Sequence, residues 1–195
     1  MGDSLQYYNQ HAREFFDSTR DVEFTQMQDR FLGYLAPGAR ILDFGCGSGR
    51  DTKYFISRGF TAEAVDGSEE LVKIASEYTG TEVRQMFFQD LDEDQVYDGI
   101  WACSSILHLA WDDLIPVFGN MHRALVPRGI LYTSFKYGTG EGERNGRYFT
   151  DMTEDKMRKM LELTSPFSIE EMWVTADVRP GRDDEKWLNM ILRKQ

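Results

Sequence analysis

The sequence predicts an α/β fold in which a mainly parallel sheet carries helices on both faces. Two observations lead to this prediction: five apolar, strand-like runs alternate with helix-like segments, and a glycine-dense turn follows the first run. Alternating strands and helices form parallel sheets with right-handed crossovers, because each helix returns the chain to the same end of the sheet. Ligands of such sheets bind beyond the carboxyl ends of the strands, so a binding site is expected there.

The expected elements follow one another in chain order. Strands are expected at 40–44, 60–65, 82–88, 97–103 and 129–135, with helices near 50–58, 68–78 and 111–124. After the fifth strand we expect a loop over 136–150, a helix near 152–163 and two strands near 167–176 and 186–193, paired as an antiparallel hairpin. Aromatic residues recur at helical spacing within 4–35, which predicts amphipathic helices before the first strand.

Length and composition favour one folded domain. The chain has 195 residues, of which 41% are hydrophobic, and a second independent domain is not expected. No stretch approaches the roughly 20 apolar residues of a membrane span. The start, Met1-Gly2-Asp3-Ser4, lacks the basic and apolar regions of a secretory signal, so a cytoplasmic location is expected.

Charge and cysteine content narrow the function. A net charge of −11 opposes binding to nucleic acid, without excluding a local basic patch. The two cysteines, Cys46 and Cys103, do not have the spacing of a disulfide framework. We interpret both cysteines as small, buried, reduced side chains rather than as a redox or metal site, although the expected fold brings the two thiols near one another.

Residues 41–52 read Ile-Leu-Asp-Phe-Gly-Cys-Gly-Ser-Gly-Arg-Asp-Thr, an apolar strand followed by a glycine-dense turn and a polar helix start. Gly45, Gly47 and Gly49 let the backbone turn sharply and approach a ligand, and the following helix presents free N–H groups there. The spacing is one residue shorter than the dinucleotide fingerprint, and Asp43 stands where nicotinamide enzymes usually have an apolar residue. These features predict a cofactor loop, although turns and helix caps also select glycine.

An acidic residue follows the second strand at the distance expected of a ribose-binding group. The run 60–65 ends in Asp66-Gly67-Ser68, about 20 residues beyond the glycines. Ser68 begins a typical helix cap with an acidic first turn, so it has a structural reason to be polar. Asp66 has no such reason and is therefore the ribose-binding candidate.

The glycine loop resembles motif I of the class I S-adenosylmethionine (SAM) methyltransferases, and further motifs follow in that family's order over about residues 38–136. Gln89-Asp90-Leu91 follows the third run, Cys103-Ser104 ends the fourth, and the segment 125–135 matches the turn into the fifth, with Arg128 in place of a glycine. Residues 45–52 are most similar to the small methyltransferases that include the tellurite-resistance enzymes. The resemblance implies a Rossmann-like, seven-stranded, mostly parallel sheet with an antiparallel C-terminal edge strand.

The resemblance also implies SAM as the cofactor, S-adenosylhomocysteine as its product, and a single methyltransferase domain over 1–195. By that resemblance Asp90 accepts from the adenine amino group, Leu91 supplies a backbone N–H to the ring, and Cys103 and Ser104 line the site. An exposed loop acid is the alternative for Asp90. The cofactor-binding residues implied in this way are Asp43, Gly45, Cys46, Gly47, Gly49, Arg50, Asp66, Gly67, Ser68, Gln89, Asp90, Leu91, Cys103 and Ser104.

Three segments flank the expected SAM-binding core of 38–136. Residues 1–36 are expected to form a helical lid, with Tyr8 as the candidate that closes over the cofactor; core packing is the alternative for its aromatic residues. Residues 137–150 are a substrate-side loop with four glycines, which suits either a mobile lid or an ordinary surface loop. Residues 151–195 are expected to supply a helix and a strand hairpin.

Methyl transfer from SAM requires alignment and exclusion of water, and it needs no nucleophilic residue or metal. If the acceptor must lose a proton, His108 is the best-placed base, though it equally suits a polar cap at a loop-to-helix junction. If the acceptor is a soft anion, cations guide it instead, and Arg50, Lys136, Arg144 and Arg147 are available, with Tyr148 beside them.

The sequence therefore predicts a SAM-dependent methyltransferase acting on a small molecule. A methyltransferase acting on a macromolecule such as tRNA or a protein is the alternative. A nicotinamide-dependent oxidoreductase would explain the glycine loop and Asp66, but not Asp43, the shorter glycine spacing or the acid after the third strand. The acceptor atom and the oligomeric state are not fixed by the sequence.

Overall fold

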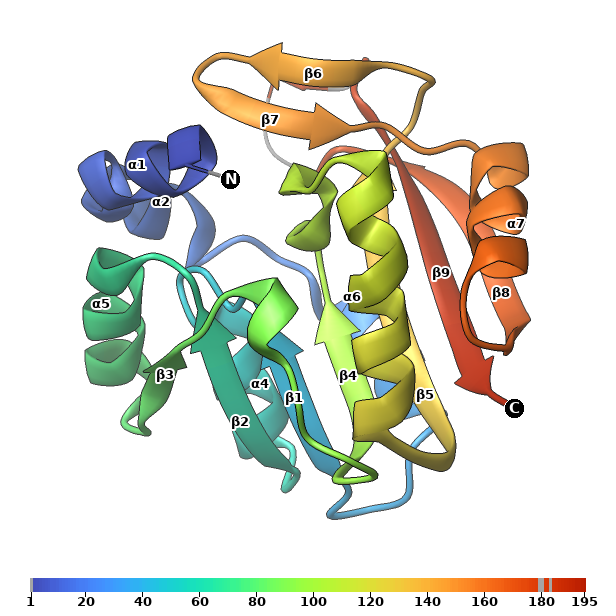
Figure 1. Ribbon diagram of the computed structural model, residues 1–195. Helices are drawn as coiled ribbons and strands as arrows, with labels where there is room; N and C mark the ends of the chain where they lie inside the picture. The colour runs from blue at the N-terminus through green and yellow to red at the C-terminus, as the bar shows by residue number, and fades with distance from the viewer. Residues whose placement is uncertain (1, 179–180, 183) are drawn as a thin grey trace.

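A seven-stranded sheet forms the centre of the molecule (Figure 1). The computed structural model describes residues 2–178, 181–182 and 184–195. The strands are ordered β3-β2-β1-β4-β5-β9-β8, and the first five strands in this order are parallel to one another. Their bounds are β1 Arg40–Phe44, β2 Thr61–Asp66, β3 Val83–Gln85, β4 Tyr97–Ala102, β5 Leu125–Lys136, β8 Phe167–Ala176 and β9 Lys186–Lys194.

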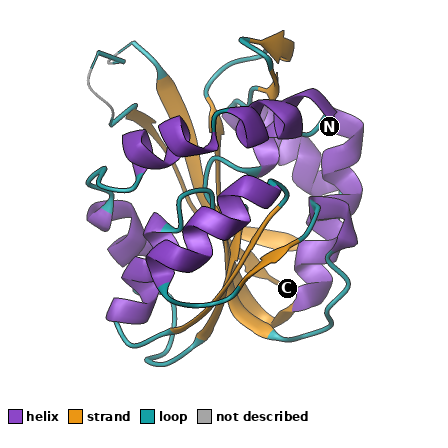
Figure 2. Ribbon diagram, turned by 90° about the vertical axis from the view of Figure 1, so that its left-hand side faces the viewer, coloured by secondary structure: helices purple, strands orange, loops and turns teal. Residues whose placement is uncertain are grey.

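Helices cover both faces of this sheet (Figure 2). Neighbouring residues of a strand point to opposite faces, so Ile41 packs with α3 (Thr25–Leu32) and α4 (Arg50–Ser57), whereas Leu42 packs with α6 (Trp111–Ala124) and α7 (Glu154–Leu163). On the α3 and α4 face, Trp101 stacks on Tyr132 with ring centroids 3.9 Å apart. Helix α5 (Glu69–Thr79) begins at the Ser68 cap, whose hydroxyl accepts from the Leu71 N–H.

The remaining elements lie above the carboxyl ends of the parallel strands (Figure 1). They are α1 (Gly2–Gln10), α2 (Ala12–Thr19) and a separate two-stranded hairpin of β6 (Glu141–Arg144) and β7 (Arg147–Thr150). Two short 3-10 helices, η1 (Phe88–Asp90) and η2 (Ile106–His108), follow β3 and β4. These segments enclose the edge of the sheet where a ligand is expected.

The predicted fold class and the antiparallel C-terminal hairpin are confirmed, whereas the length of the third strand and the segment 136–150 differ from expectation. The third strand ends at Gln85, because the chain turns away and forms η1. Strand β9 lies between β5 and β8 and runs antiparallel to both, so the C-terminal hairpin extends the sheet and β8 forms its edge.

No helix among the described residues is long and apolar enough to cross a membrane.

The expected loop over 136–150 is wrong, since it contains the β6–β7 hairpin. Its turn is formed by Asn145 and Gly146, both with positive φ (52° and 74°), which suits the twist of a two-residue hairpin turn. Asn-Gly between two polar strands was the signal that pattern reasoning missed. The substrate-side segment is therefore regular structure.

Candidate active site

A cavity of about 550 Å³ lies at the carboxyl ends of β1, β2, β4 and β5. Its lining combines the glycine loop, residues of α1 and α2, the β6–β7 hairpin and the start of β9. The volume is in the range of cofactor and small-molecule sites. The predicted site residues that line the cavity are Tyr8, Gly45, Cys46, Gly47, Arg50, Asp66, Gly67, Cys103, Ser104, His108, Lys136, Arg144 and Arg147.

The glycine loop bends tightly between β1 and α4. Gly45 and Gly47 have φ of 86° and 55°, a conformation in which a side chain is strained. A Cβ on Gly47 would also lie 2.9 Å from the Phe15 ring, so the loop packs directly beneath α2. Gly49, at φ 79°, faces Thr79 of α5 and lies outside the cavity lining, which makes its role one of packing.

Asp66 is positioned by the loop it faces. Its two carboxylate oxygens accept from the Gly47 N–H at 2.9 Å and from the Ser68 N–H at 2.9 Å. Burial raises the pKa of this carboxyl, and the backbone N–H groups oppose that effect. Each oxygen has a further lone pair and Asp66 lines the cavity, so it can accept hydrogen bonds from a diol such as ribose.

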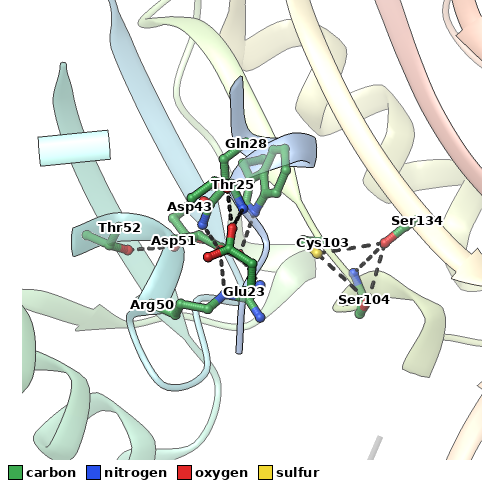
Figure 3. A network of polar contacts seen from close by, with 11 residues as sticks. Glu23, Thr25, Gln28, Asp43, Arg50, Asp51, Thr52, Cys103, Ser104 and Ser134 are labelled. Carbon is green, nitrogen blue, oxygen red and sulfur yellow. Dashed lines mark hydrogen bonds and ion pairs between the residues drawn. The ribbon is translucent and has the colours of Figure 1, made fainter. Parts of the chain in front are cut away.

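A network of polar contacts around Asp51 fixes the start of α4 (Figure 3). Asp51 accepts from Arg50 at 2.7 Å and 3.0 Å, from Gln28 at 2.6 Å and from the Trp101 indole at 2.8 Å. Burial acts to raise the pKa of Asp51, but the Arg50 guanidinium and these donors hold it below its usual range. The network ties α3 to the cofactor loop and orients Arg50 along the cavity wall.

Asp43 has a supporting role in β1. Its carboxylate accepts from the Thr52 hydroxyl at 2.5 Å, and it does not line the cavity. Burial and the nearby Asp51 raise its pKa. Asp43 and Ser68 therefore shape the two loops that surround the cavity without lining it, and their predicted cofactor contacts stay predictions.

Gln89, Asp90 and Leu91 also lie outside the cavity lining, and their contacts with the cofactor stay predictions. Gln89 and Asp90 are exposed on η1, and Leu91 is fully buried in the core. The earlier residues Met86, Phe87 and Phe88 line the cavity instead. The aromatic pair directly after the third strand was the available signal, since a planar, apolar base packs well against such rings.

The end of β4 contributes Cys103 and Ser104. Ser104 has a φ of 53°, unusual for a residue other than glycine, and its N–H donates to the Ser134 hydroxyl at 2.9 Å. Burial raises the pKa of the Cys103 thiol to about 12, and that of Cys46 well above its ordinary value. Both cysteines are free, so they act as small packing groups in the cavity wall.

The two residues predicted to be catalytic contact each other. The Tyr8 hydroxyl lies 2.9 Å from Nε2 of His108, and Nδ1 of His108 lies 2.6 Å from the Tyr148 carbonyl oxygen. Because a carbonyl only accepts, Nδ1 carries the proton, and Nε2 accepts from Tyr8. Burial lowers the pKa of His108 to about 4 and raises that of Tyr8. The pair is therefore neutral at pH 7.

The cations of the cavity wall differ in their partners. Lys136 forms an ion pair with Glu185, and Arg144 pairs with Asp151 through both of its terminal nitrogens. Arg50 is held by Asp51. The Arg147 guanidinium, by contrast, donates a hydrogen bond to the neutral Tyr8 hydroxyl at 3.4 Å.

Tyr148 acts through its backbone. Its side chain points to Glu141, with the hydroxyl donating at 2.8 Å, and does not line the cavity. Its carbonyl fixes His108, and its N–H donates to Ser4 of α1 at 2.9 Å. The side chain thus lies away from the cavity, and its predicted substrate contact stays a prediction. Sequence reasoning also missed Trp187 and Asn189 of β9, which reach the cavity only because β9 pairs with β5.

Comparisons with known proteins agree with this architecture. A family model described as a methyltransferase domain matches residues 41–129. The "Putative methyltransferase YqeM" of Bacillus subtilis (strain 168) is 32% identical over 113 residues, which cover 52% of this chain and 46% of that protein. The chain thus matches about half the length of this curated relative.

Solved structures show the same fold. A Burkholderia thailandensis 1,6-didemethyltoxoflavin-N1-methyltransferase, with 1,6-didemethyltoxoflavin and S-adenosylhomocysteine bound, superimposes with a TM-score of 0.76 at 23% identity, covering 98% of this chain and 85% of that one. A TehB-like SAM-dependent methyltransferase of Corynebacterium glutamicum has a TM-score of 0.69 at 20% identity, with 98% of each chain covered. At these identities the likeness concerns the fold, and the tellurite-resistance subgroup stays a prediction. The domain match over slightly less than half of the chain, the curated relative and the shared sheet together support the predicted class I SAM-dependent methyltransferase.

Proposed function

We propose that this protein transfers the methyl group of SAM to a small-molecule acceptor. The observation that carries the proposal is the position of the Tyr8–His108 pair, in the same cavity as the glycine loop and Asp66. Cofactor-binding and proton-handling groups therefore face one space. The enclosing helices α1 and α2 and the β6–β7 hairpin favour an acceptor that fits inside it.

The residues present fit SAM. Gly45 and Gly47 leave the loop without side chains where a ligand approaches, and the buried Asp66 offers two acceptor oxygens to the ribose hydroxyls. Met86, Phe87 and Phe88 provide an apolar surface for the adenine ring. When bound, SAM supplies a methyl group on a positively charged sulfur, which an acceptor attacks in line.

The chain's own residues then have three tasks. The aromatic side chains of α1 and α2, Tyr8 and Phe15, cover the cavity and exclude water, which we propose is the function of the N-terminal helices. The cavity wall orients the acceptor toward the cofactor. If the acceptor loses a proton, the Tyr8 oxygen receives it while Tyr8 passes its own proton to Nε2 of His108.

The proposal is tested by transfer of a radiolabelled methyl group from SAM into cell extract separated into small-molecule and macromolecular fractions. Label in the small-molecule fraction is expected, with loss of transfer in Asp66→Ala. Glu70→Ala is the control, since Glu70 is exposed and pairs with Lys73 on α5. Label retained on RNA or protein would refute the small-molecule acceptor, and failure to bind SAM would refute the activity itself.

A further inference from the structure

Four of the five cations that line the cavity in the described part of the chain have a carboxylate partner, although Lys136 and Arg182 share Glu185. Arg50, Lys136, Arg144 and Arg182 each have a carboxylate partner, and the Arg182 guanidinium lies 3.5 Å from Glu185. Among the described residues, no carboxylate lies within 4.0 Å of the Arg147 guanidinium. Arg147 is therefore the lining cation that has no carboxylate partner among the described residues.

Arg147 is held in place although it lacks an ion pair. Its guanidinium carbon lies 4.6 Å from the Tyr7 ring centroid, 5.2 Å from that of Phe149 and 5.8 Å from that of Tyr8. Its Nη1 donates to the Tyr8 hydroxyl at 3.4 Å, and its buried Nε has no partner among the described residues. Rings on several sides orient the cation without neutralising it.

A half-buried guanidinium with an unused donor is costly unless a ligand completes it, because the buried Nε–H has lost water without gaining an acceptor. Arginine binds carboxylates through planar N–H groups that match the two oxygens. The single Arg147 guanidinium offers one planar set of N–H groups, which matches one carboxylate.

We propose that the methyl acceptor is a small organic acid whose carboxylate binds Arg147. This inference rests on the proposed function, because it names the substrate of the same cavity. Tyr8 cannot be the donor to that carboxylate, since its one proton is engaged by His108, so Arg147 is the anion-binding residue. The weakly basic His108 is consistent with this assignment, because an acceptor that is already anionic needs no strong base.

The test is the binding of two isosteric probes, benzoate and the neutral benzamide, measured by isothermal titration calorimetry with and without S-adenosylhomocysteine. We expect the wild-type protein to bind benzoate at least about tenfold more tightly than benzamide, as a charged hydrogen bond requires. Arg147→Gln should reduce that ratio to about twofold or less. Arg147→Lys keeps the charge and should retain part of the preference.

The matched control is Arg158→Gln, which makes the same change on the exposed surface of α7 and should leave the ratio as in wild type. Unchanged S-adenosylhomocysteine affinity in Arg147→Gln shows that the variant is folded. Equal binding of the two probes by wild type, no benzoate binding at all, or an unchanged ratio in Arg147→Gln would each overturn the Arg147 assignment. If S-adenosylhomocysteine does not bind to wild type, the proposed function fails, and the probe ratio without it still decides the anion site.

Discussion

Acid should destabilise this protein through one buried histidine. His108 is held neutral, with Nδ1 donating to the Tyr148 carbonyl and Nε2 accepting from Tyr8. Burial lowers its pKa in the folded state to about 4, whereas in the unfolded chain it is near 6.5. As the pH falls, the unfolded state therefore binds a proton at a higher pH than the folded state does. The contribution of neutral His108 to the free energy of unfolding is complete above pH 6.5 and is lost between pH 6.5 and pH 4.

The magnitude follows from the gap between the two pKa values. At 1.36 kcal/mol per pKa unit the full loss is about 3 kcal/mol, and about 2 kcal/mol of it falls between pH 7 and pH 5. His108→Asn removes the titrating ring while its amide can still donate to the Tyr148 carbonyl. The variant should be less stable than wild type at pH 7, and that difference should shrink by about 2 kcal/mol at pH 5.

Urea unfolding of both proteins at half-unit steps from pH 7 to pH 5 measures the effect, because titration of the other groups cancels in the difference. His11→Asn, a change at an exposed histidine, is the control. A difference between wild type and His108→Asn that stays constant over this pH range would refute the reasoning.

Three further outcomes are expected. Asp66→Ala should weaken S-adenosylhomocysteine binding at least about tenfold by calorimetry, since a charged acceptor is lost, and unchanged affinity would remove Asp66 from the ribose site. Asp51→Asn should lower the free energy of unfolding in urea by about 3 kcal/mol, because Arg50 keeps its buried charge without a counter-ion, and a loss below about 1 kcal/mol would contradict this. Arg128→Gly should raise stability by roughly 0.5–1 kcal/mol in thermal unfolding, because Arg128 has a φ of 65°; a lower melting temperature would show that its side chain contributes more than the strained backbone costs.

The sequence was a good guide to elements that bury a regular apolar face. The helix expected at 111–124 is observed over Trp111–Ala124, because its buried side chains recur at helical spacing against β4 and β5. Strand β6 is largely exposed and β7 buries only Phe149 and Thr150, so periodicity gave no signal for the hairpin, and its Asn145-Gly146 turn was the available one.

The site was predicted where local sequence determines the backbone and missed where distant segments meet. The glycine loop and Asp66 lie in neighbouring parallel strands, so their proximity follows from the motif itself. The order of the motifs predicted that the segment after β3 contributes to the site, but it did not predict which of its residues line the cavity. The turn after Gln85 decides which side chains point inward. The contact of Tyr8 with His108 joins residues 100 positions apart, and no local pattern encodes it.

The position of β9 has a consequence for biosynthesis. Strand β5 pairs with β9, which the ribosome makes only after the hairpin, α7 and β8. Until then β5 presents an open, largely apolar edge, and such an edge readily pairs with other chains. At about 5–20 residues per second this interval lasts several seconds. The cavity wall is therefore incomplete until Trp187 and Asn189 have been made and β9 has paired with β5.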